Sequence, residues 1–138
     1  MVYRPLRWLS TRSSAHVQVW DGAPGYRLRT GLGAALDEAE RLQLRAAYGR
    51  VASRDNAYHA LEQALRYQVS ERIEATAQLY AYVYDQPVAG RRTALSQLAT
   101  LGVRAAGSLR VVWGVSLVQS PYSRTDLQST LSLLYDGT

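Results

Sequence analysis

The alternation of apolar and polar residues is the main signal of this chain, and it is clearest over residues 73–85. There the odd positions before Asp85 carry apolar side chains, and the even positions carry polar residues or tyrosine. Successive side chains of a β-strand point to opposite faces, so this pattern predicts a long strand with one face in a core. The second face carries a row of three tyrosines, namely Tyr80, Tyr82 and Tyr84.

Shorter alternating stretches predict two strand pairs. Residues 15–20 alternate and run into Asp-Gly and Pro-Gly turn signals, and residues 26–29 then form a short return strand, so we expect a hairpin. Residues 109–119 and 127–135 also alternate, with a polar break between them. We expect these last two strands to form an antiparallel pair joined by a loop.

Three other segments have apolar residues at helical spacing, so we predict helices there. The first covers residues 34–52, with acidic residues at its start and arginines toward its end, as the helix dipole favours. The second follows a cap at Ser53, Asp55 or Asn56 and runs to about residue 69, with Glu62 and Arg66 as an i,i+4 pair. The third covers residues 91–106, with Gly107 as its C-terminal cap.

The predicted order is therefore β-β-α-α-β-α-β-β. Strands with a clear inside and outside favour an α+β fold, in which an antiparallel or mixed β-sheet has helices packed on one face. With 138 residues the chain is long enough for one domain, which we place at residues 14–138. Residues 1–13 lack a regular period and are predicted to form an N-terminal arm.

No catalytic or metal-binding signature stands out, so we expect no enzyme and no cofactor. Cysteine is absent, and the two histidines, His16 on a predicted strand and His59 on a predicted helix, have no acidic cluster around them. No serine lies in a nucleophile motif. The Gly31-Leu32-Gly33 stretch faintly suggests a phosphate-binding turn at a helix start, with plain helix entry as the alternative.

The composition adds charge but little specificity. The formal net charge is +5, every basic residue is an arginine, and phenylalanine is absent. Arginine suits bidentate contacts with phosphates and interfaces, although a solvated arginine surface explains the same composition. No stretch approaches the roughly 20 apolar residues that a membrane helix needs, so we expect no membrane partner. We expect no small-molecule substrate either.

The tyrosine face has three interpretations that the sequence leaves open. A helix could cover it and make it core. A second subunit could cover it, since tyrosine is enriched in interface cores. Nucleic-acid bases could instead stack on it, provided that arginines lie beside the rings on the same sheet.

The predicted elements of the C-terminal half are, in order, a long strand, a helix, a strand, a polar loop and a final strand that ends in Leu-Leu-Tyr-Asp. Over residues 73–136 this pattern resembles the small tail-terminator and head–tail joining proteins of tailed bacteriophages. The N-terminal half departs from that family, because a hairpin and two helical segments stand where a leading helix and a strand are expected.

The resemblance implies a structural virion protein of the tail or neck, assembled in the host cytoplasm. It implies a homo-oligomeric ring, a hexamer, that contacts other tail or neck proteins and touches passing DNA without reading its sequence. The implied interface residues are Tyr80, Tyr82, Tyr84, Trp8, Pro121, Tyr122 and Arg124.

The rival expectation is a nucleic-acid-binding module that combines the tyrosine-bearing face with arginines. The candidate contacts for that function are Arg4, Arg7, Arg12 and Arg110.

Overall fold

The fold was determined as a computed structural model of the whole chain. It describes residues 2–6, 8–20, 23–37, 39–52, 56–106, 108–123 and 125–135. These residues form nine strands and, within the described ranges, no helix. The strands are β1 (Val2–Leu6), β2 (Leu9–Trp20), β3 (Ala23–Ala35), β4 (Leu42–Ala52), β5 (Ala57–Gln68), β6 (Ile73–Val88), β7 (Arg91–Ala106), β8 (Leu109–Gln119) and β9 (Asp126–Tyr135).

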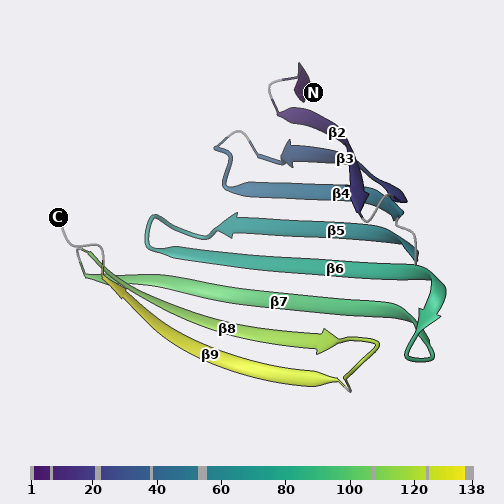
Figure 1. Ribbon diagram of the computed structural model, residues 1–138. Coiled ribbons are helices and arrows are strands. Elements are labelled where there is room, and N and C mark those ends of the chain that lie inside the picture. Colours follow the sequence, from purple (N-terminus) through teal and green to yellow (C-terminus); the bar gives the residue numbers. More distant parts are fainter. Residues whose placement is uncertain are drawn as a thin grey trace.

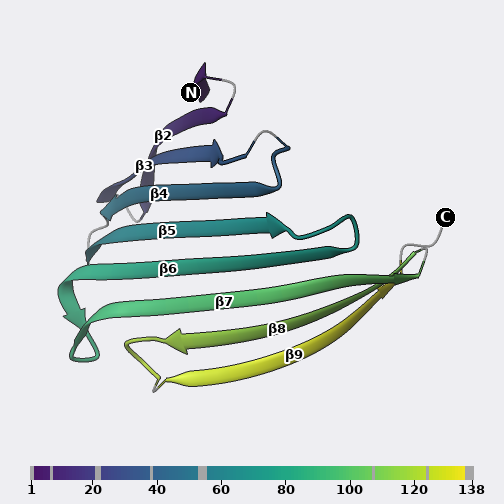
Figure 2. The same cartoon turned by 180° about the vertical axis from the view of Figure 1, so that it is seen from behind.

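The nine strands form one sheet in which each strand pairs with its neighbours in the sequence. The strand order is β1-β2-β3-β4-β5-β6-β7-β8-β9, and every pairing is antiparallel. Figures 1 and 2 show the strands lying side by side in chain order, with β1 and β9 at the two edges. Connections are short, as between β6 and β7, where Ala89 and Gly90 have φ values of 47° and 78° that fit a tight hairpin turn.

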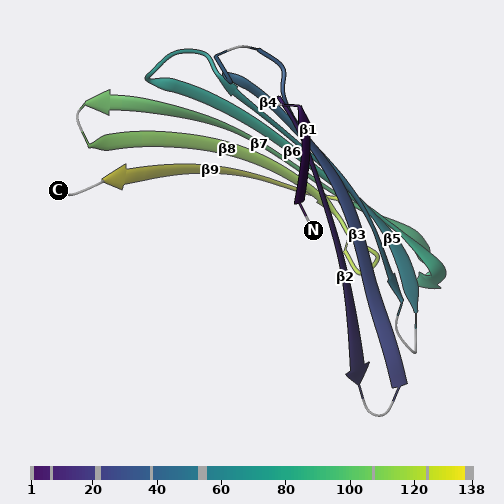
Figure 3. The ribbon, with the colours of Figure 1, turned by 90° about the horizontal axis from the view of Figure 1, so that it is seen from above.

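The sheet is a single curved layer, and the view from above shows how strongly it bends (Figure 3). Among the described residues Ala60 is the only buried hydrophobic one. The accessible surface is 10377 Å², whereas a compact monomer of this mass exposes about 7,100 Å². The described part of the chain also contains no helix long and apolar enough to cross a lipid bilayer. The fold therefore has two broad faces and almost no interior of its own.

The strands predicted from alternation are confirmed. The long strand begins at Ile73 as expected and continues to Val88. The last two strands are β8 and β9, and they pair antiparallel with Trp113 opposite Leu131. The predicted N-terminal hairpin is the β2–β3 pair, which is longer on both sides than the alternation indicates. Residues 2–6 and 9–13 of the segment predicted as an arm belong to β1 and β2.

The α+β fold class is wrong, because all three predicted helices are strands. Residues 34–52 contain the end of β3 and all of β4, the second helix is β5, and the third is β7. The predicted Glu62–Arg66 pair is wrong too, since Glu62 binds Arg29 and Arg66 binds Glu74. The predicted caps Ser53, Asp55 and Gly107 lie outside the described residues, and Gly31 and Gly33 lie inside β3 rather than at a helix start.

The physical reason for the error is that an i,i+4 spacing fits both a helix and a strand. Leu61 and Leu65 lie on one side of either element, because four residues are about one helical turn and also two strand repeats. Alanine and arginine have a high intrinsic helix propensity in the absence of tertiary contacts. Pairing with flanking strands on both sides overrides that weak local preference, and β5 has such neighbours in β4 and β6.

Candidate functional site: the two faces of the sheet

The strand register divides the side chains into two faces of different chemistry. Paired residues of neighbouring strands point to the same side of a sheet. The row that contains Leu44, Leu65 and Val115 therefore marks one face, which we call the apolar face. The next row contains Arg45 and Gln78 and marks the opposite side, which we call the polar face.

The apolar face is exposed. Of the strand residues that are large, hydrophobic and exposed, all but Val118 and Leu134 lie on it in the described part of the chain. Its exposed members include Leu44, Leu61, Leu65, Leu101, Leu131 and Leu133. Large contiguous apolar surfaces on a folded protein mark contact with another protein or with lipid.

Aromatic residues lie toward both ends of the apolar face. Tyr26 and Tyr48 lie toward one end, and Tyr67, Trp113 and Tyr135 toward the other. Tyr67 is paired with Leu42, six residues from Tyr48 along β4 and ten from Ala52, the partner of Tyr26. At about 3.3 Å per residue, the two sets of rings are about 20 to 33 Å apart along the strand. Much of the exposed apolar surface thus lies between rings that carry a polar atom, while Val19 of β2 lies beyond Tyr26.

The polar face is hollowed and carries ionic side chains. A cavity of about 870 Å³ opens over β2–β6 and a second of about 150 Å³ over β3–β6, and the charged residues that line them belong to this face. Glu74 accepts hydrogen bonds from Arg66 Nε at 2.8 Å and from Arg110 Nη2 at 3.0 Å. The hydroxyls of Thr76 and Thr100 are 2.7 Å apart.

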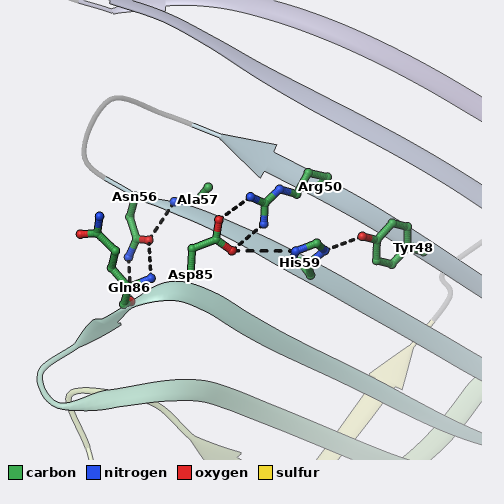
Figure 4. Close-up of polar contacts among 7 residues, drawn as sticks. All are labelled: Tyr48, Arg50, Asn56, Ala57, His59, Asp85 and Gln86. Atoms are coloured by element: carbon green, nitrogen blue, oxygen red, sulfur yellow. Dashed lines mark hydrogen bonds and ion pairs between the residues drawn. The ribbon is translucent and has the colours of Figure 1, made fainter.

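A polar cluster of four residues lies at one end of the apolar face (Figure 4). The hydroxyl of Tyr48 and Nδ1 of His59 share a hydrogen bond, and His59 Nε2 lies 3.8 Å from Asp85 Oδ1. Arg50 binds the same carboxylate with both terminal nitrogens, Nη1 to Oδ1 at 2.7 Å. The hydrogen bonds from Arg50 lower the pKa of the Asp85 carboxyl, and the same contact raises the pKa of Arg50.

The sequence of groups Tyr48, His59 and Asp85 resembles a proton relay, but 3.8 Å between His59 Nε2 and Asp85 Oδ1 is too long for a hydrogen bond. The place of the three residues in the fold does not favour catalysis either. They lie on the apolar face, and none of the three lines either cavity. Next to it, the Asn56 amide donates to the carbonyl of Gln86 at 3.1 Å and fixes the start of β5 against β6 (Figure 4). In the described residues no group of three or more acidic or histidine side chains could hold a metal ion.

The predicted interface residues do not gather in one place. Tyr80, Tyr82 and Tyr84 lie in a row on the polar face, where Tyr82 and Tyr84 contact Tyr58 of β5 with ring centroids 5.9 and 5.6 Å apart. Trp8 is exposed between β1 and β2. In the β8–β9 loop Pro121 is buried and Tyr122 exposed.

The arginines predicted for nucleic-acid contact are also divided. Arg12 and Arg110 lie on the polar face, the same face as the tyrosines, and Arg110 is paired with Glu74. Arg4 lies on β1, and Arg7 lies outside the described residues, as does Arg124 of the predicted interface.

Sequence analysis missed the arginines at the larger cavity and the contacts of His59 with Tyr48 and Asp85. Arg27, Arg29 and Arg45 lie on the polar face beside Arg12, because the β2–β3–β4 register brings them together. Arg45 and His59 lie in two predicted helices that are β4 and β5 in the structure. The sequence did carry one signal for a strand at residues 57–68. Tyr58, Glu62 and Arg66 all have even numbers and would therefore share one face of a strand.

Comparison of the chain with protein-family models, with curated proteins and with solved structures finds no match. The bacteriophage resemblance stays a prediction, and the helix that it includes at residues 91–106 is β7 in the structure.

Proposed function

We propose that this chain is a membrane-embedded β-sheet, whose apolar face contacts lipid acyl chains while its polar face borders an aqueous space. The observation that carries the proposal is the segregation of exposed apolar side chains onto one face of a single layer, with almost no buried core. In water such a face would be costly, at roughly 25 cal/mol for each Å² of apolar surface.

The dimensions of the sheet support a lipid environment. Strands β2 to β9 contain between 10 and 16 residues, and a tilted strand needs about 9–11 residues to cross a bilayer. The rings of Tyr48 at one end and of Tyr67 and Trp113 at the other are placed as amphipathic aromatics are at the two membrane interfaces. Arg50, His59 and Asp85 then lie at headgroup level.

The polar face fits an aqueous side. It carries the Arg29–Glu62 and Arg66–Glu74 ion pairs and the larger cavity. Because unpaired backbone groups are costly in hydrocarbon, the edges β1 and β9 would pair with further strands, from the same polypeptide or from a second copy.

The chain has no cysteine, so single cysteines test the lipid contact directly. Leu65→Cys and Ala64→Cys place a label on the apolar and polar faces of β5, and Leu131→Cys and Ser132→Cys do the same on β9. The protein is labelled with a polarity-sensitive fluorophore and mixed with lipid vesicles. We expect labels at 65 and 131 to be quenched by spin-labelled lipid, and labels at 64 and 132 by aqueous iodide.

Equal quenching by spin-labelled lipid at 65 and 64, and at 131 and 132, would contradict the proposal. Loss of lipid quenching at Leu65→Cys together with a discrete soluble oligomer would mean that a second copy covers the apolar face.

The ring-subunit function is the rival proposal, and self-association decides between them. In a ring that uses the tyrosine row, Tyr82→Ala weakens assembly while the subunit stays folded. In a membrane sheet the variant loses its Tyr58 contact and keeps its lipid quenching pattern. Light scattering at several protein concentrations, combined with circular dichroism, separates the two.

A further inference from the structure

The polar face carries four arginines on β2, β3 and β4 whose levels step evenly along the strand direction, and we call them the arginine row. Through the Cα pairs, Arg45, Arg12, Arg29 and Arg27 lie level with β4 residues 45, 47, 49 and 51. Each step is two residues, about 6.6 Å along the strand. All four arginines line the cavity of about 870 Å³, as does His16.

Three of these arginines have no acidic partner within the described part of the chain. Arg29 is paired with Glu62, which is the one acidic residue among those that line the larger cavity. Arg12, Arg27 and Arg45 are exposed and make no such pair. In the opposite half of the same face one carboxylate, Glu74, pairs with both Arg66 and Arg110. On β2–β4 three arginines without an acidic partner among the described residues therefore lie on the same face.

Three arginines of the row have glycine as a cross-strand partner. The cross-strand partner of Arg45 is Gly33, and Arg12 and Arg29 are paired with glycines in the same way, at Gly31 and Gly49. A glycine has no side chain to cover the guanidinium next to it. The planar guanidinium donates two parallel hydrogen bonds to carboxylate, phosphate or sulfate oxygens.

We propose that the arginine row Arg45–Arg12–Arg29–Arg27 binds oxyanions and holds them at successive positions along the strand direction. This anion-binding proposal rests on the proposed function, because the anion would reach the row from an aqueous space along the polar face. The ligand chemistry is a phosphate, sulfate or carboxylate group, free or carried on a small solute.

Calorimetric titration of the full chain in detergent micelles tests the row. The probes are inorganic phosphate, sulfate, acetate and tripolyphosphate, and the order of affinities identifies which oxyanion the row prefers. Arg12→Gln/Arg45→Gln removes two members of the row. Arg41→Gln/Arg72→Gln removes the same charge from two exposed arginines in turns. We expect the first variant to bind phosphate about tenfold more weakly and the second to bind nearly as the parent does.

An equal loss of affinity in both double variants would show that only net charge matters and would overturn the proposal, as would a parent protein that binds none of the probes. A single-stranded oligonucleotide that binds far more tightly than tripolyphosphate, and that depends on Tyr80, would overturn it in favour of nucleic-acid binding. Circular dichroism confirms that both variants are folded. Because binding is measured in micelles, a negative result leaves the lipid quenching test unaffected, and a failed quenching test leaves the binding result intact.

Discussion

Arg29 on β3 and Glu62 on β5 form an ion pair across the intervening strand β4 on the polar face. The two strands are about 9.6 Å apart, twice the spacing of neighbouring strands. The β4 residues at their level are Gly49 and Ala47, whose small size lets the long side chains meet. Two residues 33 positions apart in sequence are thus partners, and the pair reduces the charge of the arginine row.

The first prediction is that Glu62→Gln strengthens anion binding. Arg29 then joins Arg12, Arg27 and Arg45 as an unpaired cation, so we expect severalfold tighter binding of phosphate in the calorimetric titration. The pair is exposed, at 51% for the Arg29 side chain and 31% for Glu62, so the free energy of unfolding should change by less than about 1 kcal/mol. Unchanged or weaker binding would mean that Arg29 does not contribute to the row.

The second prediction concerns the apolar face. Leu65→Arg places a charge among Leu44, Ala77 and other apolar neighbours on that face. In a lipid bilayer we expect the substitution to lower the free energy of unfolding by about 2–4 kcal/mol. Denaturant titration in lipid vesicles measures it. The matched variant Ala64→Arg adds the same charge to the polar face, and a comparable loss there would contradict the lipid assignment of the apolar face.

The third prediction is a loss of stability in acid that depends on Asp85. Arg50 lowers the pKa of this carboxyl below its ordinary value of 3.8. A lowered pKa in the folded state means that the pair stabilises the fold fully above that value, and that the contribution is lost as pH falls below it. Asp85 follows Val83 on β6, beyond the apolar part of that strand.

Asp85→Asn should therefore remove part of the stability difference between pH 6 and pH 3 (values chosen to span the ordinary carboxyl range). Denaturant titrations at the two pH values provide the measurement. Asp126→Asn is the control, because no ion pair of Asp126 is present in the described structure. An identical pH dependence in the parent and in Asp85→Asn would count against the pair.

The fourth prediction tests the crowding on the polar face. Gly49 is buried, and a Cβ there would lie 3.2 Å from the carbonyl oxygen of Leu28 and 3.9 Å from the Cβ of Ala60. Gly49→Leu should cost about 1–3 kcal/mol by overpacking. Ala46→Leu on the apolar face of the same strand changes a residue that is half-buried rather than buried, so it should cost less. Similar costs for both would show that the polar face is not tightly packed at Gly49.

Alternation within single strands predicts some features of the candidate site and not others. The parity of β6 is visible in the sequence, so the placement of Tyr80, Tyr82 and Tyr84 on one face could be predicted. The ion pair between Arg29 and Glu62 could not, because it depends on the register of β3, β4 and β5. The sequence instead favours Arg66 as the partner of Glu62, because Arg66 is four residues away. In the structure Glu62 pairs with Arg29.

The amino-acid sequence by itself determined the alternation that makes β6, β8 and β9, and it determined the turns between them. Along β4, β5 and β7 it was ambiguous, since alanines on both faces blur the two-residue period and leucines four apart fit a helix equally well. Only the tertiary structure decided these segments, because strand pairing on both sides satisfies the backbone more fully than local helix preference can. It also decided what the apolar face means. Alternation predicts that one face of each strand is buried away from water. Only the single-layer arrangement shows that no part of the described chain covers that face.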